Sequence, residues 1–223
     1  MRQRNIKDIE YKLAEHDRLL ITEPAEKRGV WRQSFDHGQA GGSANGIPRL
    51  YLELGCGKGR FICETAARDP AGAYIGVEGQ QSVMYRALVN AEERELPNLL
   101  FCPCYIREMD MYFAESELLG IYLNFSDPWP KARHEKRRLT APGYLAGYLH
   151  ALEAGGFLRV KTDNDDFFAY SRTGIEAMPG FEIVECTDDL HRSAYGRGNV
   201  MTEYEHKFLN IGRRIKYLFA RRR

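Results

Sequence analysis

The residues best suited to chemistry in this chain lie between positions 124 and 138. This run contains a carboxylate, Asp127, followed by a rigid Pro-Trp-Pro turn and then a cluster of cations. The residues before it, 120–124, are apolar and β-rich, which predicts a buried strand that ends just before Asp127. Ligands of open α/β sheets bind at the carboxyl ends of the strands. An acid beside a row of Lys and Arg therefore indicates a polyanionic substrate held next to the reacting groups.

A glycine-rich turn, Glu53-Leu-Gly-Cys-Gly-Lys-Gly59, follows an earlier predicted strand and precedes a predicted helix. Alternate glycines let the backbone approach a ligand closely. The spacing differs from the G-x-G-x-x-G of dinucleotide sites, and Glu53 suits a ligand with a cationic amino-acid end better than a pyrophosphate. Glu78 ends the next strand, where an acid can accept both ribose hydroxyls of an adenosine. Each feature alone is also typical of a tight turn, but together they favour a nucleoside cofactor.

These motifs are positioned by strands that alternate with helices. Strands are predicted at 50–54, 73–77, 99–104, 121–125, 157–161, 181–186 and 215–219, and helices at 8–20, 60–68, 80–94 and 142–153, with helical spacing again at 204–211. Such alternation implies a parallel sheet with right-handed crossovers. The fold prediction is an α/β, doubly wound, mostly parallel seven-stranded sheet preceded by an N-terminal arm. Residues 1–46 are expected to form this arm and a flexible loop, and residues 47–223 one domain.

Composition limits the classes of protein that fit. The chain has 223 residues, of which 43% are hydrophobic and 28% charged, as in a globular enzyme with one sizeable core. No apolar stretch approaches the roughly 18 residues that span a bilayer, and the amino terminus lacks the apolar core of a signal peptide. The five cysteines include no Cys-x-x-Cys pair. We therefore expect reduced thiols, no metal and a cytoplasmic location.

The net charge of +1 hides separate basic segments. Residues 131–138 carry five Lys and Arg and one acid, and residues 213–223 carry six basic residues and no acid; Arg2, Arg4 and Lys7 add a basic arm. Separate basic patches allow a near-neutral protein to bind nucleic acid locally. For any single patch, a solvated face is the commoner explanation.

Three motifs together resemble the bacterial tRNA (guanine-N7)-methyltransferases. They are the glycine-rich turn, the run Asn-Phe-Ser-Asp-Pro-Trp-Pro-Lys-Ala-Arg-His-Glu-Lys-Arg-Arg at 124–138, and Thr202-Glu-Tyr-Glu205. The turn is shared by many S-adenosylmethionine enzymes, whereas the second motif is close to diagnostic. The resemblance implies a class I methyltransferase (Rossmann-like) fold, S-adenosylmethionine as donor, and a guanosine in the tRNA variable loop as acceptor. It also makes a homodimer an expectation, because similar members pair.

The resemblance assigns roles position by position. The implied cofactor-binding residues are Glu53, Gly55, Gly57, Glu78, Tyr105, Asn124 and Asp127, and Asp127 is also the implied catalytic residue. The implied substrate-binding residues are Lys131, Asp163, Thr202, Glu203, Tyr204 and Glu205. The implied RNA-interacting residues are Arg133, His134, Glu135, Lys136, Arg137 and Arg138. One position departs from the family, because Tyr105 stands where an acid commonly meets the adenine amino group.

Several of these residues have a structural alternative. Asp163 fits a helix N-cap as well as a substrate contact, and Thr202 with Glu205 has the spacing of a capping box. Trp129 fits a base-stacking residue or a buried anchor. His134 lies among cations that disfavour its protonated form, so we expect an RNA or structural contact rather than a general base.

The methylation chemistry agrees with the motifs. Guanine N7 has a free lone pair and no hydrogen, so its methylation requires alignment rather than a general base. A fixed carboxylate such as Asp127 can accept guanine N–H groups and stabilise the charge that develops on the base. Three other functions remain open: methylation of an exocyclic amino group, a non-catalytic RNA-binding protein of the same fold, and a nicotinamide dehydrogenase. Only the glycine turn suggests the last, and the chain has no Tyr-x-x-x-Lys dyad.

Overall fold

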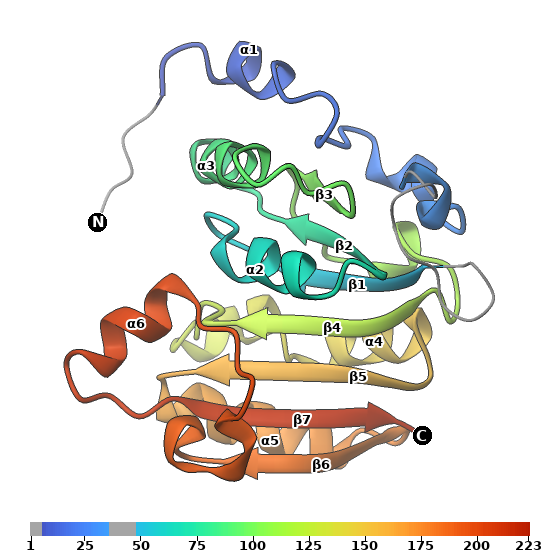
Figure 1. Ribbon diagram of the computed structural model, residues 1–223. Coiled ribbons are helices and arrows are strands. Elements are labelled where there is room, and N and C mark those ends of the chain that lie inside the picture. Colours follow the sequence, from blue (N-terminus) through green and yellow to red (C-terminus); the bar gives the residue numbers. More distant parts are fainter. Residues whose placement is uncertain (1–5, 36–47) are drawn as a thin grey trace. The chain divides into compact units, whose positions relative to one another are not determined.

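Two compact units make up the chain, residues 1–106 and residues 107–223. The structure is a computed structural model that describes residues 6–35 and 48–223 (Figure 1). The predicted flexible loop at 38–46 and the basic residues Arg2 and Arg4 lie outside the described residues. The predicted domain boundary at 46/47 falls in the same segment, so it stays a prediction.

Unit 1 is built on three parallel strands. Its elements are helix α1 (Ile9–Ala14), 3₁₀ helices Pro24–Lys27 and Trp31–Ser34, strand β1 (Arg49–Leu54), helix α2 (Arg60–Arg68), strand β2 (Gly72–Val77), helix α3 (Gln81–Glu92) and strand β3 (Leu99–Cys102). The strand order is β3-β2-β1. Every residue of β2 and β3 is buried, which is the pattern of parallel strands covered on both faces.

Unit 2 contains the other four strands. Its elements are 3₁₀ helix Met109–Met111, strand β4 (Leu118–Asn124), 3₁₀ helix Ala132–Arg137, helix α4 (Pro142–Ala151), strand β5 (Leu152–Thr162), helix α5 (Asp165–Ala177), strand β6 (Phe181–Thr187), 3₁₀ helices Leu190–Arg192 and Ala194–Gly196, helix α6 (Glu203–Leu209) and strand β7 (Lys216–Arg222). The order is β4-β5-β7-β6; β5 is parallel to β4, and β7 is antiparallel to β5 and β6. In Figure 1, α4 and α5 lie behind these strands, and α6 lies near the arrow tips of β4 and β5.

The seven strands and their mostly parallel pairing confirm the predicted fold class. Several predicted elements are longer than the observed ones, and for two of them the structure shows the cause. The helix expected at 8–20 ends at Ala14. Residues 19–21 instead run beside β3, where the Ile21 N–H donates to the Phe101 carbonyl and the Phe101 N–H donates to the Leu19 carbonyl. The strand expected at 99–104 ends at Cys102, since Pro103 has no N–H to donate and the Cys104 N–H turns back to the Cys102 carbonyl.

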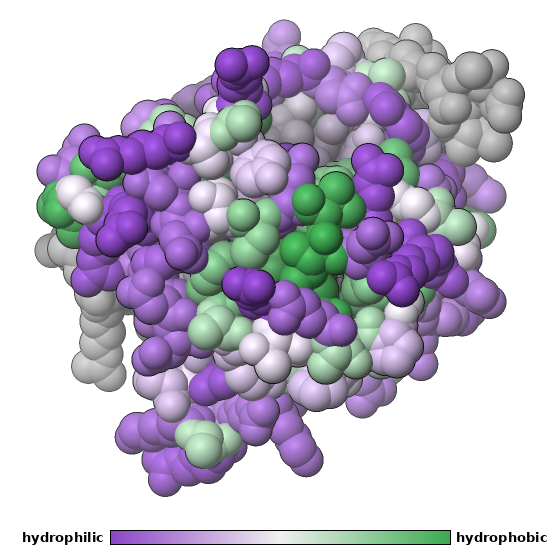
Figure 2. Space-filling view, turned by 90° about the horizontal axis from the view of Figure 1, so that it is seen from below, coloured by the Kyte–Doolittle hydropathy of each residue, from purple (hydrophilic) through white to green (hydrophobic). Residues whose placement is uncertain are grey.

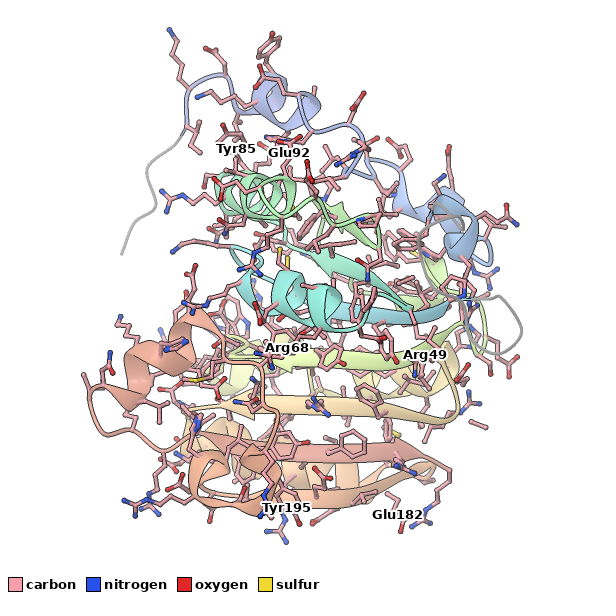
Figure 3. The ribbon with its side chains drawn as sticks, viewed as in Figure 1. Arg49, Arg68, Tyr85, Glu92, Glu182 and Tyr195 are labelled. Carbon is pink, nitrogen blue, oxygen red and sulfur yellow. The ribbon has the colours of Figure 1, made fainter. Side chains whose placement is uncertain are left out.

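The described part of the predicted arm packs on α3 within unit 1. Figure 3 shows Tyr85 and Glu92 extending from α3 towards α1. His16 Nδ1 lies 2.7 Å from the Glu92 carboxylate, and Lys12 Nζ lies 5.8 Å from the centre of the Tyr85 ring. These contacts attach residues 9–16 to a helix that follows the second strand.

Strand β6 is the edge of the sheet in unit 2. It lies lowest in Figure 1, and Figure 2, which is seen from that side, shows hydrophobic side chains gathered in the middle of the view and ringed by hydrophilic ones. Val184 on this strand is 50% exposed. The pairing with β7 shifts register between Ile183 and Glu185, an irregularity that disrupts the ladder at an edge.

No helix among the described residues is long and apolar enough to cross a membrane.

Candidate functional site

The glycine-rich turn of unit 1 is shaped for close approach of a ligand. Gly55, Gly57 and Gly59 all have left-handed backbone angles, with φ of 74°, 59° and 78°. A Cβ placed on Gly55 or Gly57 would meet no atom within 4 Å. The space above these two residues is therefore open, and it is the left-handed backbone that requires glycine there.

Two carboxylates flank this turn. Glu53, at the end of β1, is 2% exposed. Glu78 follows β2, and its Oε2 accepts the Gly57 N–H at 3.2 Å while its Oε1 accepts the Gln80 N–H at 2.9 Å. Burial raises the pKa of the intervening Cys56 thiol well above its usual value, and the charges of Glu53 and Glu78 raise it further. Glu78 thus fixes the turn and places a carboxylate beside the open backbone.

Tyr105 lies against the backbone next to Glu78. Its side chain is 66% exposed, and a Cβ on Gly79 would come within 2.2 Å of its ring. The ring therefore occupies the place of a side chain at position 79. Gly79 was not predicted as a site residue, because nothing in its local sequence indicates a contact with the ring of Tyr105.

In unit 2, Asp127 lies on an exposed turn directly after β4. Two non-glycine residues of this turn are left-handed, Phe125 with φ of 53° and Trp129 with φ of 41°. Such angles cost roughly 1–3 kcal/mol each and persist where surrounding contacts impose them. Trp129 is half-buried, with the Arg137 guanidinium 4.9 Å and the His134 ring 5.5 Å from its ring centre. Asn124, before the turn, is buried.

The cationic segment that follows the turn is mostly exposed. Lys131, Arg133, Glu135, Lys136 and Arg137 are exposed, and His134 and Arg138 are half-buried. Arg138 differs from the others in its partners. It donates to the carbonyls of Pro128 and Trp129, and its guanidinium lies 4.2 Å from the centre of the Tyr170 ring.

The stretch Thr202 to Glu205 begins α6 with a capping box. Thr202 Oγ1 accepts the Glu205 N–H at 3.0 Å, and Glu205 Oε2 accepts the Thr202 N–H at 3.2 Å. The capping alternative is therefore confirmed as a structural role. Tyr204 is 53% exposed, and Glu203 is half-buried.

Glu205 is fully buried and is surrounded by polar partners. Its Oε2 accepts from Lys161 Nζ at 2.8 Å, and its Oε1 accepts from Asn199 Nδ2 and lies 2.9 Å from His191 Nε2. Lys161, on β5, is 1% exposed and also donates to the Val200 carbonyl and to Asn199 Oδ1. Lys161, His191 and Asn199 were not predicted as partners of Glu205, because no sequence pattern shows which side chains meet a buried carboxylate after folding.

Aromatic contacts bring the predicted substrate residues of unit 2 together. The Phe125 ring lies 6.0 Å from the Tyr204 ring and 5.7 Å from the Phe208 ring. The Arg213 guanidinium, 5.5 Å from the centre of the Phe208 ring, forms an ion pair with Asp163. The Asp127 turn, the start of α6 and Asp163 thus form one connected set.

Asp163 is not the helix cap. The N-cap of α5 is Asn164, whose side chain accepts the Phe167 N–H at 2.8 Å. The Asp163 carboxylate instead pairs with Arg213, and its carbonyl accepts from Lys216 Nζ at 3.0 Å. The prediction that Asp163 caps the helix was therefore wrong, because the cap of α5 is the next residue, Asn164.

A family model described as a putative methyltransferase matches residues 48–218. A tRNA (guanine-N(7)-)-methyltransferase of Lachnoclostridium phytofermentans is 41% identical over 99% of this chain and 98% of its own length. A protein of the same name from Geobacillus thermodenitrificans is 43% identical over 96% of this chain and 94% of its own.

Solved structures show the same fold at low identity. The 16S rRNA methyltransferase KamB matches with a TM-score of 0.58 and 15% identity, over 99% of this chain and 96% of that one. The antibiotic-resistance methyltransferase Kmr matches with a TM-score of 0.52 and 20% identity, over 78% and 86% of the two chains. These matches agree with the alternating, mostly parallel architecture described above.

Proposed function

Because this chain belongs to the tRNA (guanine-N(7)-)-methyltransferase family, we propose that it methylates N7 of a guanosine in tRNA. S-adenosylmethionine is the methyl donor. The observation that carries the proposal is the Asp127 turn: an exposed carboxylate at the carboxyl end of β4, held on a strained backbone and followed by exposed cations. At the finer level, we propose guanosine 46 of the variable loop as the target.

The residues of unit 1 fit the chemistry of the donor. Glu53 is an anion for the amino-acid end, and the open backbone at Gly55 and Gly57 admits the donor closely. Glu78 keeps lone pairs for the ribose hydroxyls, and the Tyr105 ring offers a flat surface for adenine in place of the usual acid. Asn124, at the end of β4 in unit 2, is a further residue that we propose for binding S-adenosylmethionine.

The reaction needs alignment more than proton transfer. When bound, the donor supplies an electrophilic methyl group on a sulfonium, and the guanine N7 lone pair forms the new N–C bond as the S–C bond breaks. Positive charge therefore leaves sulfur and appears on the purine. Asp127 accepts guanine N–H groups and stabilises that charge. No residue has to remove a proton from N7, because N7 carries none.

The remaining residues hold the RNA. Lys131, Arg133, Lys136 and Arg137 contact phosphates, which gives sequence-independent, salt-sensitive binding. Asp163 and the segment that begins α6, residues 202–205, form the proposed site for the target nucleoside. Because the Glu205 carboxylate is fully buried, its part is to hold Thr202 and Tyr204 in place, and Tyr204 is the member of the stretch that is exposed enough to meet a base.

The direct test uses the whole chain. The purified protein is incubated with labelled S-adenosylmethionine and unmodified tRNA, and the product is mapped by chemical cleavage at 7-methylguanosine. We expect one cleavage site, at guanosine 46. Label on an exocyclic amino group of adenine or cytosine would replace this proposal by the exocyclic alternative. Salt-sensitive tRNA binding without transfer would instead identify a non-catalytic RNA-binding protein.

A further inference from the structure

Arg138 is the last residue of the cationic run, and its side chain turns towards the Asp127 turn. Its Nε donates to the Pro128 carbonyl at 3.1 Å and to the Trp129 carbonyl at 3.3 Å, and an Nη donates to the Trp129 carbonyl at 3.1 Å. Consecutive carbonyls of the turn thus share one guanidinium. A planar fork of donors suits this geometry, whereas an ammonium does not.

The guanidinium is also held from its other side. It lies 4.2 Å from the centre of the Tyr170 ring on α5, within the range of a cation–π contact. The Tyr170 hydroxyl donates to the Glu135 carboxylate at 3.0 Å, so the ring that supports Arg138 is itself fixed by the 3₁₀ helix Ala132–Arg137. Arg138 therefore connects the turn, this 3₁₀ helix and α5.

The turn needs such support. Trp129 has a φ of 41° and is flanked by Pro128 and Pro130, which have no backbone N–H. A left-handed tryptophan does not keep this conformation without contacts that impose it. At the other end of the turn, the Phe125 N–H donates to the Lys161 carbonyl at 2.8 Å. Arg138 supplies the hydrogen bonds on the far side of Asp127.

The neighbouring cations are placed differently. Among the described residues, Lys131, Lys136 and Arg137 make no hydrogen bond or ion pair through their side chains, and all three are exposed. The Arg137 guanidinium lies 4.9 Å from the centre of the Trp129 ring. These three side chains are available for phosphates, whereas Nε and one Nη of Arg138 donate to the turn.

We propose that Arg138 is a positioning residue, which fixes the Pro128 and Trp129 carbonyls and so sets the position of Asp127, and that it is not a phosphate contact. The role in methyl transfer rests on the proposed function. The fixed geometry of the turn does not, so the two can be tested separately.

The test compares the same substitution at two adjacent positions. Arg138→Lys is compared with Arg137→Lys, and Arg138→Ala is compared with Arg137→Ala. Lysine keeps the charge but cannot reach both carbonyls as a fork. We expect Arg138→Lys to lower single-turnover methylation at saturating tRNA and donor by about 100-fold, since small displacements of a reacting group can cost that much. Its dissociation constant for tRNA should stay within about threefold of wild type.

The alanine pair separates the two cations by salt dependence. Arg137→Ala should weaken tRNA binding and lower the slope of log K against log salt by about one. Arg138→Ala should leave that slope unchanged. If Arg138→Lys turns over like wild type while Arg138→Ala lowers the slope by about one, then Arg138 is a phosphate contact and the inference is wrong.

A spectroscopic measurement keeps the inference testable without activity. The chain has two tryptophans, Trp31, which is 0% exposed, and Trp129. Acrylamide quenching therefore reports mainly on Trp129. We expect Arg138→Lys to increase quenching while the far-UV circular dichroism stays unchanged; unchanged quenching counts against the inference. Should the wild type transfer no methyl group to tRNA, the proposed function fails, and the quenching still decides the role of Arg138.

Discussion

At the scale of single residues, Asp127 combines exposure with a fixed position. Phe125 and Trp129, two positions before and two after it, have left-handed backbones, and Arg138 holds the carbonyls of Pro128 and Trp129. An exposed carboxylate on an ordinary loop samples many positions, and ordering it on binding costs conformational entropy. Here the fold has already ordered the backbone, so the charge is placed before the substrate arrives.

Replacing Asp127 with Asn tests this role with little change in shape. We expect turnover to fall by roughly 100-fold or more, the cost of losing one preorganised electrostatic group, with little change in thermal stability because the side chain is exposed. Single-turnover transfer from labelled donor measures the effect. Asp188→Asn, another exposed Asp of unit 2, is the matched control and should keep wild-type turnover. An Asp127→Asn protein as active as this control would remove Asp127 from catalysis.

Gly79 offers a second test, aimed at the donor. A methyl group at this position overlaps the Tyr105 ring, so Gly79→Ala should displace Tyr105 at a cost of about 1–3 kcal/mol. We expect the affinity for the donor to fall by about tenfold or more. Calorimetry with S-adenosylhomocysteine measures this affinity. Gly143→Ala is the control, since a Cβ there meets no atom within 4 Å. Equal affinities for the two variants would show that Tyr105 does not contact the donor.

At the scale of elements, a buried ion pair attaches α6 to β5. Lys161 and Glu205 are 1% and 0% exposed and lie 2.8 Å apart. Neither charge has access to water, so each depends on the other and on Asn199 and the Val200 carbonyl. The segment that presents Tyr204 is therefore held by polar contacts as well as by the packing of Phe125 against Phe208.

Lys161→Met should destabilise the protein by roughly 3–5 kcal/mol, because it leaves the Glu205 carboxylate buried without its cation. Urea unfolding monitored by circular dichroism measures the loss. The exposed pair of Arg172 and Glu176 on α5 is the comparison, and Arg172→Met should cost far less stability, because solvent screens this pair. Similar losses for both variants would mean that burial does not set the strength of the pair. The double variant Lys161→Met with Glu205→Leu should recover part of the stability.

Elements that are determined by their local sequence were predicted well, whereas those that depend on contacts with distant residues were not. Helix α2 and strand β1 follow from hydrophobic periodicity and were predicted to within one residue. The early end of α1 follows from contacts with Phe101, and no local pattern shows these. For the site, the exposed Asp127 turn was predictable from the strand before it. The direction of the Arg138 side chain and the partners of Glu205 were not, because both depend on residues brought together by folding.

At the scale of the whole molecule, the two basic segments of unit 2 differ in how many of their charges form ion pairs. The exposed cations at 131–137 have few protein partners, whereas three of the basic residues at 213–223 form ion pairs: Arg213 with Asp163, Lys216 with Asp165, and Arg223 with Glu182. Half of the basic residues in the second segment are thus paired with acids that lie elsewhere in the sequence. Charge available to a polyanion is concentrated beside the Asp127 turn.

Reversal of single charges should distinguish the two segments. We expect Lys136→Glu to weaken tRNA binding and to lower its salt slope, because an exposed cation is lost and an anion gained. Arg223→Glu should have a much smaller effect. Filter binding of tRNA at several salt concentrations measures both. Equal losses for the two variants would show that the ion-paired segment also contacts RNA.

Strand β7 also has a consequence for how the protein is made. It is inserted between β5 and β6, so during synthesis β6 leaves the ribosome before the only strand that it pairs with in the described sheet. Until residues 216–222 emerge, one side of β5 and both sides of β6 have unpaired backbone groups, and nascent chains at this stage can associate with each other or with chaperones. Completion of unit 2 must therefore await translation of β7.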